Sequence, residues 1–236
     1  MKKDIKKFTV LIFLFLFTNL FTANIFRIVK AKNITLIGSD LISIDDITEN
    51  TSLKLPTRLI FIKTKLIEKE LKQNLSLKQI SIIRQIFPFG LIIQIKHRVP
   101  LAFTEKKVND TIVEGYVDIE GIFIEKRYLP YVERLRNPIK IFGWDHEYKN
   151  FISEILKSYR KNDDLTAINI SSEGFITLDD KKLEKIFLGS RPPEINQQLI
   201  FINEIKNQLS NIRLQKKIKS LDLSDPFNPQ IKVFIP

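Results

Sequence analysis

A run of nineteen residues near the N-terminus, Phe8–Phe26, contains no charged side chain. A bilayer core takes about 20 mostly apolar residues of α-helix, so the run is just long enough to cross a membrane. Lysines in residues 1–7 give the positive flank that is typical of the cytoplasmic side. We therefore expect a cytoplasmic tail over residues 1–7, a transmembrane helix over residues 8–26 as the membrane contact, and a periplasmic or extracytoplasmic remainder.

Two other interpretations of this run stay open. A cleaved signal peptide would use Phe8–Phe17 as its apolar part, but the small-residue cleavage pattern is poor because Phe21 precedes Ala23 by two positions. A buried core helix would show a polar second face, which the run lacks. The uncleaved anchor is the preferred interpretation, and it predicts a single-pass protein of the inner (plasma) membrane.

The composition of the chain removes several chemistries. There is no cysteine among the 236 residues, which excludes disulfides, thiol nucleophiles and cysteine-ligated zinc. The net charge is +11, but the lysines and arginines are scattered and form no basic helix or arm. We therefore interpret the charge as general basicity with some affinity for an acidic surface, and we expect no nucleic-acid partner.

Residues 31–102 alternate short strands with amphipathic helices. Ser43 followed by acidic residues is typical of a helix N-cap, and Pro88–Phe89–Gly90 is a tight-turn signal between two isoleucine-rich strands. The order strand, helix, helix, strand, strand predicts a compact unit with helices on one face of a small sheet. The predicted elements are a strand at Asn33–Ile37, a helix after Ser43, a helix at Arg58–Lys72, and strands at Lys78–Phe87 and Leu91–Arg98.

Residues 103–236 are richer in strands, and the predicted class for the whole chain is α+β with a mostly antiparallel C-terminal β domain. Glu120–Gly121, Glu173–Gly174 and Leu188–Gly189 are predicted turns. The predicted helices are Glu147–Tyr159 and one from Pro192–Pro193 to Ser210. The predicted strands are Thr111–Asp118, Gly121–Glu125, Ile139–Phe142, Leu165–Ile170, Phe175–Leu178, Lys185–Leu188, Ile218–Leu223 and Gln230–Ile235.

The sequence offers little for catalysis. His97 and His146 are the only histidines, and neither has a second ligand at metal-binding spacing. The adjacent aspartates at 45–46, 163–164 and 179–180 diverge on a helix or strand and are typical of solvated turns. A glycine-rich phosphate loop is also missing. We therefore expect no enzyme activity, no catalytic residues, no metal, no cofactor and no small-molecule substrate.

The stretch Ile83–Ala102 carries the most specific pattern in the chain. Ile83–Arg84 and Phe87–Pro88 precede an alternating run of Leu91, Ile93 and Ile95, and the stretch ends on Arg98, Pro100 and Ala102. It resembles the last two strands of the polypeptide-transport-associated (POTRA) domain in FtsQ/DivIB cell-division proteins. His97 stands where that family usually has glutamate, which removes a possible pairing with Arg98.

Further landmarks follow in the family's order. Ile34–Ser39 resembles the domain's opening strand and turn, and Val117–Phe123 resembles an Asp-x-x-Gly-x-x-Phe segment through Asp118 and Gly121. Later family positions are matched by Leu129–Pro130, by Ile186–Gly189, which includes Gly189, and by Leu221–Leu223, which includes Asp222. Ser224 replaces the arginine that usually follows the last of these. Each of these residues also has a purely structural interpretation as a strand end, turn or cap.

The resemblance implies a POTRA domain over 31–102 and an FtsQ-type β domain over 103–236. It implies a non-enzymatic divisome scaffold at the division septum that links early and late division proteins and binds an FtsB–FtsL-like coiled-coil pair through its C-terminal strand. Gln230–Ile235 alternates its side chains and would accept a partner strand at a sheet edge. The expected contacts are Ile231, Val233 and Phe234, with Phe234 as an aromatic anchor or, alternatively, a core residue.

Two other classes of function stay open. A POTRA-bearing protein-export or outer-membrane assembly factor would share the first domain, although the chain shows a single such unit. A basic nucleic-acid binder would need interleaved aromatic and basic side chains on one surface.

Overall fold

The computed structural model describes residues 9–15, 27–108, 111–129, 138–160, 164–190, 194–211, 218–225 and 227–233. The chain divides into two compact units, Met1–Arg98 and Val99–Pro236. The predicted boundary lay a few residues later, after Ala102, because Pro100 and Ala102 were assigned to the end of the first domain. Strand β6 instead begins at Pro100, so both residues belong to the second unit.

The predicted transmembrane helix at Phe8–Phe26 is wrong. No helix within the described residues is long and apolar enough to cross a membrane. Of the predicted span the structure describes residues 9–15, which are helical. The single-pass topology and the inner-membrane location rested on this helix and are corrected with it.

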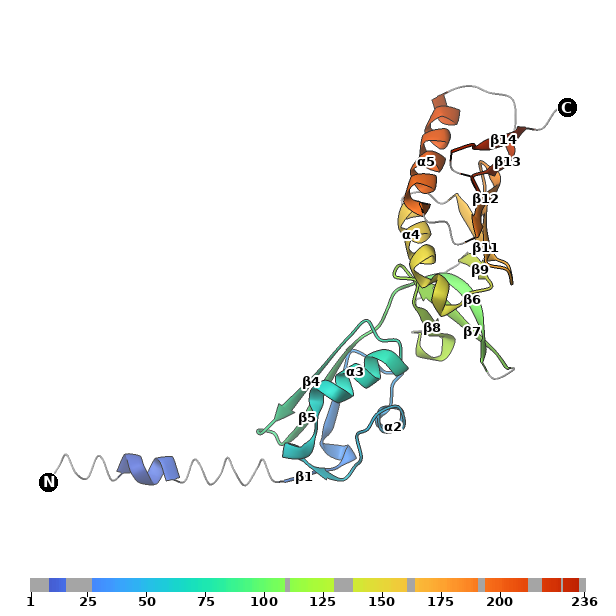
Figure 1. Ribbon diagram of the computed structural model, residues 1–236. Coiled ribbons are helices and arrows are strands. Elements are labelled where there is room, and N and C mark those ends of the chain that lie inside the picture. Colours follow the sequence, from blue (N-terminus) through green and yellow to red (C-terminus); the bar gives the residue numbers. More distant parts are fainter. Residues whose placement is uncertain are drawn as a thin grey trace. The chain divides into compact units, whose positions relative to one another are not determined.

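The first unit has the predicted β-α-α-β-β order and is built on a three-stranded sheet (Figure 1). The sheet order is β2-β5-β4, with β2 parallel and β4 antiparallel to the central β5. A small separate pair joins β1 and β3. The elements are β1 Ile28–Val29, β2 Ile34–Ile37, α2 Ile44–Glu49, β3 Thr57–Arg58, α3 Thr64–Asn74, β4 Gln79–Gln85 and β5 Gly90–Lys96, with short 3-10 turns at Ala31–Asn33 and Leu59–Phe61.

Local chemistry explains the two helices of this unit. The Ser43 hydroxyl accepts from the Asp46 N–H, and the Asp46 carboxylate accepts from the Ser43 N–H, so α2 begins with a capping box. Helix α3 begins at Thr64, later than predicted, because the preceding residues form β3 and a 3-10 turn. Glu68 of α3 accepts the backbone N–H of Ile82 in β4 at 2.8 Å, which fastens the helix to the sheet.

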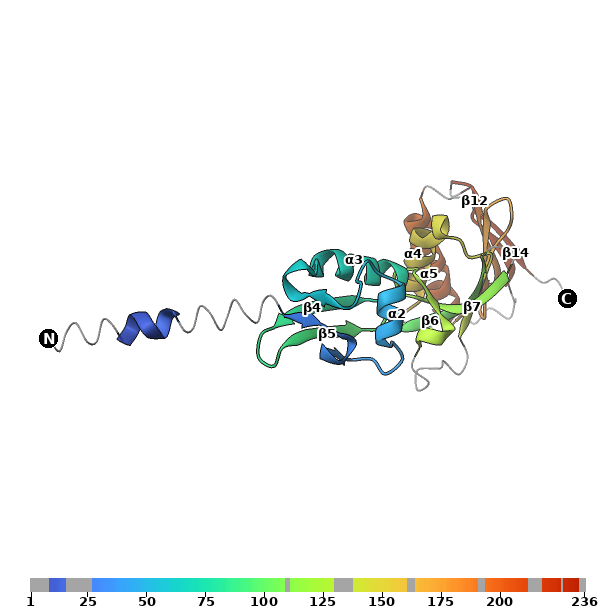
Figure 2. The same ribbon diagram turned by 90° about the horizontal axis from the view of Figure 1, so that it is seen from below.

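The second unit is a nine-stranded mixed sheet with two helices on one face (Figures 1 and 2). Its order is β14-β13-β12-β11-β10-β9-β6-β7-β8, and the pairs β6–β9, β9–β10 and β12–β13 are parallel. The helices are α4 Lys149–Tyr159 and α5 Ile195–Asn211. The strands are β6 Pro100–Val108, β7 Thr111–Asp118, β8 Phe123–Glu125, β9 Ile139–Phe142, β10 Leu165–Ile170, β11 Phe175–Asp180, β12 Glu184–Ser190, β13 Ile218–Asp222 and β14 Gln230–Val233.

The core of this unit lies between the sheet and the two helices. Alternate strand residues such as Ile168, Leu178 and Ile186 are fully buried and meet Ile155 of α4 and Ile202 of α5. The opposite face of the sheet carries no helix among the described residues. The α+β class is therefore confirmed, while the sheet is more mixed than the predicted antiparallel domain.

Two strand predictions are corrected. Strand β6 was not predicted, because its second half reads Glu105–Lys106–Lys107 and lacks an apolar alternation. Leu188–Gly189 was predicted as a turn, but both residues lie inside β12. Gly189 has a φ of +87° and sits at a β-bulge, where the pairing with β11 slips by one residue. The start of the second predicted helix, Pro192–Pro193, lies outside the described residues.

Candidate docking edge of the large sheet

Strand β14 forms one end of the nine-stranded sheet, as Figure 1 shows. It pairs antiparallel with β13, with Ile231 opposite Leu221 and Val233 opposite Ile218. Its other side has no strand among the described residues. Alternate residues of such a strand direct backbone N–H and C=O groups away from the sheet, where another chain is able to pair with them.

The side chains of Ile231 and Val233 make this edge apolar. Each is paired with a buried residue of β13, so both lie on the face of the sheet that carries α5. Yet Ile231 is 50% exposed and Val233 39% exposed. Complete burial of an aliphatic side chain contributes about 1.5–3 kcal/mol, so covering what is exposed here contributes roughly 1 kcal/mol per residue. Phe234, the third predicted contact, lies outside the described residues.

Gln198 of α5 holds the strands next to this edge in place. Its buried side-chain amide donates to the backbone carbonyl of Leu188 at 3.0 Å and to that of Leu223 at 2.7 Å. These two carbonyls belong to β12 and to the residue after β13. One helix side chain therefore bridges the parallel pair β12–β13. Among the described strands, β14 pairs with β13 alone.

A buried ion cluster fastens the other end of α5. Lys206, only 3% exposed, ion-pairs through Nζ with Asp180 and with Asp164, the latter at 3.4 Å. The same Nζ lies 4.2 Å from the centre of the Tyr159 ring in α4, a cation–π distance. Asp180 also accepts the backbone N–H groups of Lys182 and Leu183. The cluster thus ties both helices to the turn between β11 and β12.

The charges in this cluster shift two pKa values. Desolvation tends to raise the pKa of Asp164, but the hydrogen bond from Lys182 and the charges of Lys206 and Lys182 outweigh it, and the net shift is downward. Burial, reinforced by the Asp180 carboxylate, raises the pKa of Tyr159 well above its usual range. Lys206 is enclosed by the carboxylates of Asp164 and Asp180 and the ring of Tyr159, which gives this lysine a structural role.

The first group of family-motif residues is structural. Arg84 of β4 donates to the carbonyl of Ile62, and Pro88 lies in the turn between β4 and β5. Arg98 is buried at the end of the first unit. Pro100 opens β6, where a missing N–H is tolerated, and Ala102 is buried two positions later.

The second group is structural as well. Asp118 ends β7 and accepts the N–H groups of Glu120 and Ile122, which closes the turn that contains Gly121 at a φ of +74°. Asp222 ends β13 and accepts the N–H of Ser224 at 3.0 Å. Asp118 pairs in register with Pro100, and the motif residues as a set are spread over both units.

The histidines and the described members of the aspartate pairs lie in separate elements or turns. His97 and His146 belong to different units. Asp46 caps α2, Asp179 accepts from Asn169, and Asp180 belongs to the ion cluster. Across the part of the chain that the structure describes, no three histidine, aspartate or glutamate side chains are grouped to hold a metal ion.

Sequence reasoning missed Gln198 and Lys206, although a signal was present. The predicted apolar stripe of α5 runs through Ile195, Leu199 and Ile202. Gln198 is three residues after Ile195, and Lys206 is four after Ile202, so both fall on the buried stripe. A polar residue on such a stripe predicts a buried hydrogen-bonding or ionic partner.

No protein-family model matches the sequence, and no curated protein matches it either.

Proposed function

We propose that this chain is a non-enzymatic scaffold of the FtsQ/DivIB kind, which binds an FtsB–FtsL-like coiled-coil pair in bacterial cell division through β14. The observation that carries the proposal is the exposed end of the nine-stranded sheet, where Ile231 and Val233 are incompletely covered. The landmarks of the family resemblance, in their order along the chain, supply the identity of the partner.

The recognition mode that this edge supports is strand addition. A partner strand would pair with the outward backbone groups of β14, each net hydrogen bond contributing about 0.5–1.5 kcal/mol. Its side chains on the α5 face would cover Ile231 and Val233. Those on the other face would meet Gln230 and Lys232, whose β13 partners are Asp222 and Ser220. Main-chain pairing would supply affinity, and the two faces would supply specificity.

The first unit gives the scaffold a second place to bind. Its sheet ends on β2 and β4, and Ile37 and Ile83 on these strands are exposed. Other division proteins would attach there, so that one chain would connect early and late members of the assembly. This part of the proposal rests on the β-α-α-β-β order and the stretch Ile83–Ala102.

The test is calorimetric titration of the full chain with its co-encoded FtsB–FtsL-like pair. The variant Ile231→Asp/Val233→Asp places two charges on the α5 face of β14, and we expect it to weaken binding at least about a hundredfold, from burial lost and charge desolvated. The matched control is Lys232→Ser on the opposite face, which keeps the edge and its backbone. Circular dichroism and melting must be unchanged in both variants. Wild-type affinity in the double variant would show that β14 is not the docking site. An absence of binding by the wild type would show that the FtsB–FtsL-like pair is not the partner.

A further inference from the structure

A hollow of about 450 Å³ opens on the second unit where β6 runs on beyond the end of β9. The pairing of β6 with β9 ends at Thr104, which lies opposite Ile141. On its other side β6 stays paired with β7 as far as Val108. Gly143, with a φ of +73°, turns the chain away after β9. Residues 105–108 therefore form an open edge of β6, with no strand beside them on the β9 side among the described residues.

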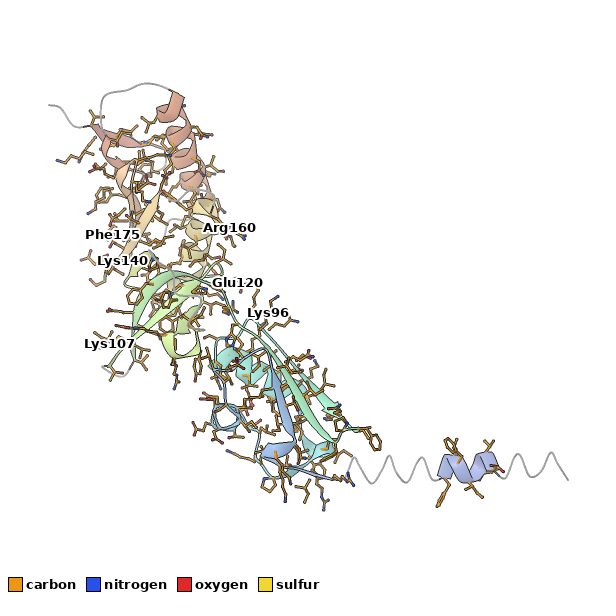
Figure 3. The ribbon with its side chains drawn as sticks, turned by 180° about the vertical axis from the view of Figure 1, so that it is seen from behind. Lys96, Lys107, Glu120, Lys140, Arg160 and Phe175 are labelled. Atoms are coloured by element: carbon orange, nitrogen blue, oxygen red, sulfur yellow. The ribbon has the colours of Figure 1, made fainter. Side chains whose placement is uncertain are left out.

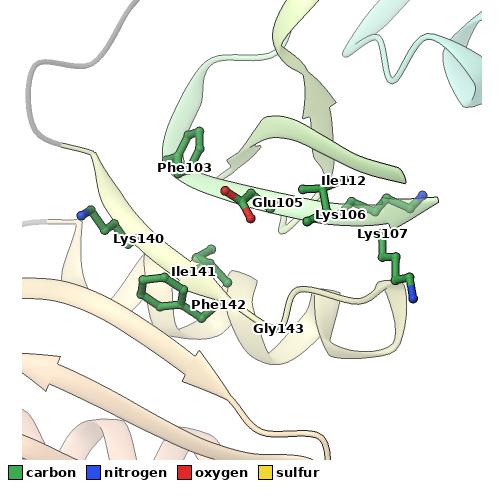
Figure 4. Close-up of a pocket in the computed structure, with 9 residues that line it drawn as sticks. All are labelled: Phe103, Glu105, Lys106, Lys107, Ile112, Lys140, Ile141, Phe142 and Gly143. Atoms are coloured by element: carbon green, nitrogen blue, oxygen red, sulfur yellow. The ribbon is translucent and has the colours of Figure 1, made fainter. Parts of the chain in front are cut away.

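The sides of the hollow combine apolar and basic groups. Figure 4 shows Phe103, Glu105 and Lys106 along β6, beside Lys140, Ile141 and Phe142 of β9 and Gly143 directly after it. Phe142 is 54% exposed and Ile112 69% exposed, so the hollow has two incompletely covered apolar side chains. The charged side chains are the three lysines 106, 107 and 140 and one glutamate, Glu105.

The alternation of side chains assigns these groups to two faces. Thr104 is buried and its hydroxyl donates to the Ile141 carbonyl, and Lys106 lies over the Trp144 ring, so these residues face the core. Phe103 and Lys107 alternate with Thr104 and Lys106 along β6, so their side chains lie on the opposite face of the sheet, away from the core. Figure 3 shows Lys107 and Lys140 on the side of the sheet opposite the helices. The hollow is thus reached from the face of the sheet that no described helix covers.

We propose that the open edge of β6 takes up an extended acidic segment of a partner protein as an added strand. Backbone groups of alternate residues within 105–108 would pair with it. Its carboxylates would meet Lys107 and Lys140, and its apolar side chains would cover Phe142 and Ile112. The lysine excess favours an acidic occupant, and Glu105 together with the main-chain edge favours a polypeptide over a nucleic acid. This site is separate from β14 and does not depend on the function proposed above.

The probe for the test is a blocked synthetic peptide that alternates glutamate with valine, added to the full chain. Binding is followed by fluorescence anisotropy, and its place by amide hydrogen exchange. We expect slower exchange at residues 105–108 and an affinity at least about tenfold above that of a lysine–valine peptide. The variant Lys107→Glu/Lys140→Glu should reverse that preference. Ile231→Asp/Val233→Asp is the matched control and should bind the acidic peptide like the wild type.

Several results would overturn the proposal. Unchanged exchange at residues 105–108 with millimolar peptide would remove the edge as a site, and so would protection confined to β14. Retained preference for the acidic peptide in the charge-reversed variant would show that Lys107 and Lys140 do not select it. Equal competition by single-stranded DNA would indicate a nucleic-acid surface. Sedimentation as a dimer whose amides at 105–108 exchange faster on dilution would make a second copy the occupant.

Discussion

Replacing Lys206 by methionine tests how α5 is held on the sheet. Methionine keeps a flexible chain of similar length but removes the charge that faces Asp180 and Asp164. Asp180 is buried, and its second oxygen would lose its cation, although the first keeps the N–H groups of Lys182 and Leu183. Asp164 keeps Lys182 at 3.2 Å. The change therefore leaves one buried carboxylate largely uncompensated.

Removing one partner of a buried ion pair costs about 3–5 kcal/mol. Because Asp180 keeps two hydrogen bonds, we expect Lys206→Met to lower the free energy of unfolding by the lower end of this range, about 3 kcal/mol. For a domain of this size one kcal/mol corresponds to about 2–4 °C, so the melting temperature should fall by roughly 10 °C. Adding Asp180→Asn removes the orphaned charge and keeps the oxygen that caps the turn. The double variant should recover about 2 kcal/mol of that loss.

Urea unfolding followed by tryptophan fluorescence is the suitable assay. Trp144 is the single tryptophan and is buried in the core of the second unit, so its emission reports this unit alone. The matched control is Lys182→Met, which removes a half-exposed lysine from the same cluster and should cost less than about 1 kcal/mol. An unchanged midpoint for Lys206→Met, or no recovery in the double variant, would refute the role of the cluster.

Three further predictions concern the same unit. Folding lowers the pKa of Asp164, so the contribution of this carboxylate to stability is complete above its unfolded pKa of about 3.9. That contribution disappears as the pH falls through the folded pKa. The stability difference between the wild type and Asp164→Asn, from urea midpoints, should therefore be constant near neutrality and shrink below about pH 4. Gln198→Leu leaves the carbonyls of Leu188 and Leu223 without a donor and should cost about 1–3 kcal/mol, with faster amide exchange in β13 and β14; unchanged exchange there would contradict its bridging role. Gly143→Ala places a side chain against the Ile170 carbonyl at a φ of +73° and should cost roughly 1–3 kcal/mol by Trp144 fluorescence, whereas an unchanged midpoint would show that the turn adapts.

Local patterns predicted most of the elements. Alternation of apolar side chains gave β7, β9 and β10 with the bounds that the structure shows, at Thr111–Asp118, Ile139–Phe142 and Leu165–Ile170. Strand β6 was missed because its polar second half runs past β9 and therefore needs no apolar alternation. The membrane helix rested on a charge-free run alone, and no helix among the described residues is long and apolar enough to cross a membrane.

Non-local features were out of reach of the sequence. The parallel pairs that place β9 between β6 and β10, and β13 beside β12, join segments far apart in the chain. No periodicity within either strand specifies such a neighbour. The candidate edge was partly predictable, since the alternation of side chains in Gln230–Ile235 is typical of a strand. The burial of its supports, Gln198 and Lys206, could be inferred from the apolar stripe of α5, but their partners could not, because these come from other strands and turns.

The parallel pairing of β12 with β13 has a consequence for when the chain becomes competent to bind. Two parallel neighbours cannot be joined by a tight turn, and here the connection contains α5. Long-range pairing of this kind forms only after the closure of the loop that joins its strands. Strand β14 is attached to the molecule through β13. A chain whose α5 has not docked thus offers no ordered edge, and a partner that bound β14 as proposed would select fully folded molecules over partly folded ones.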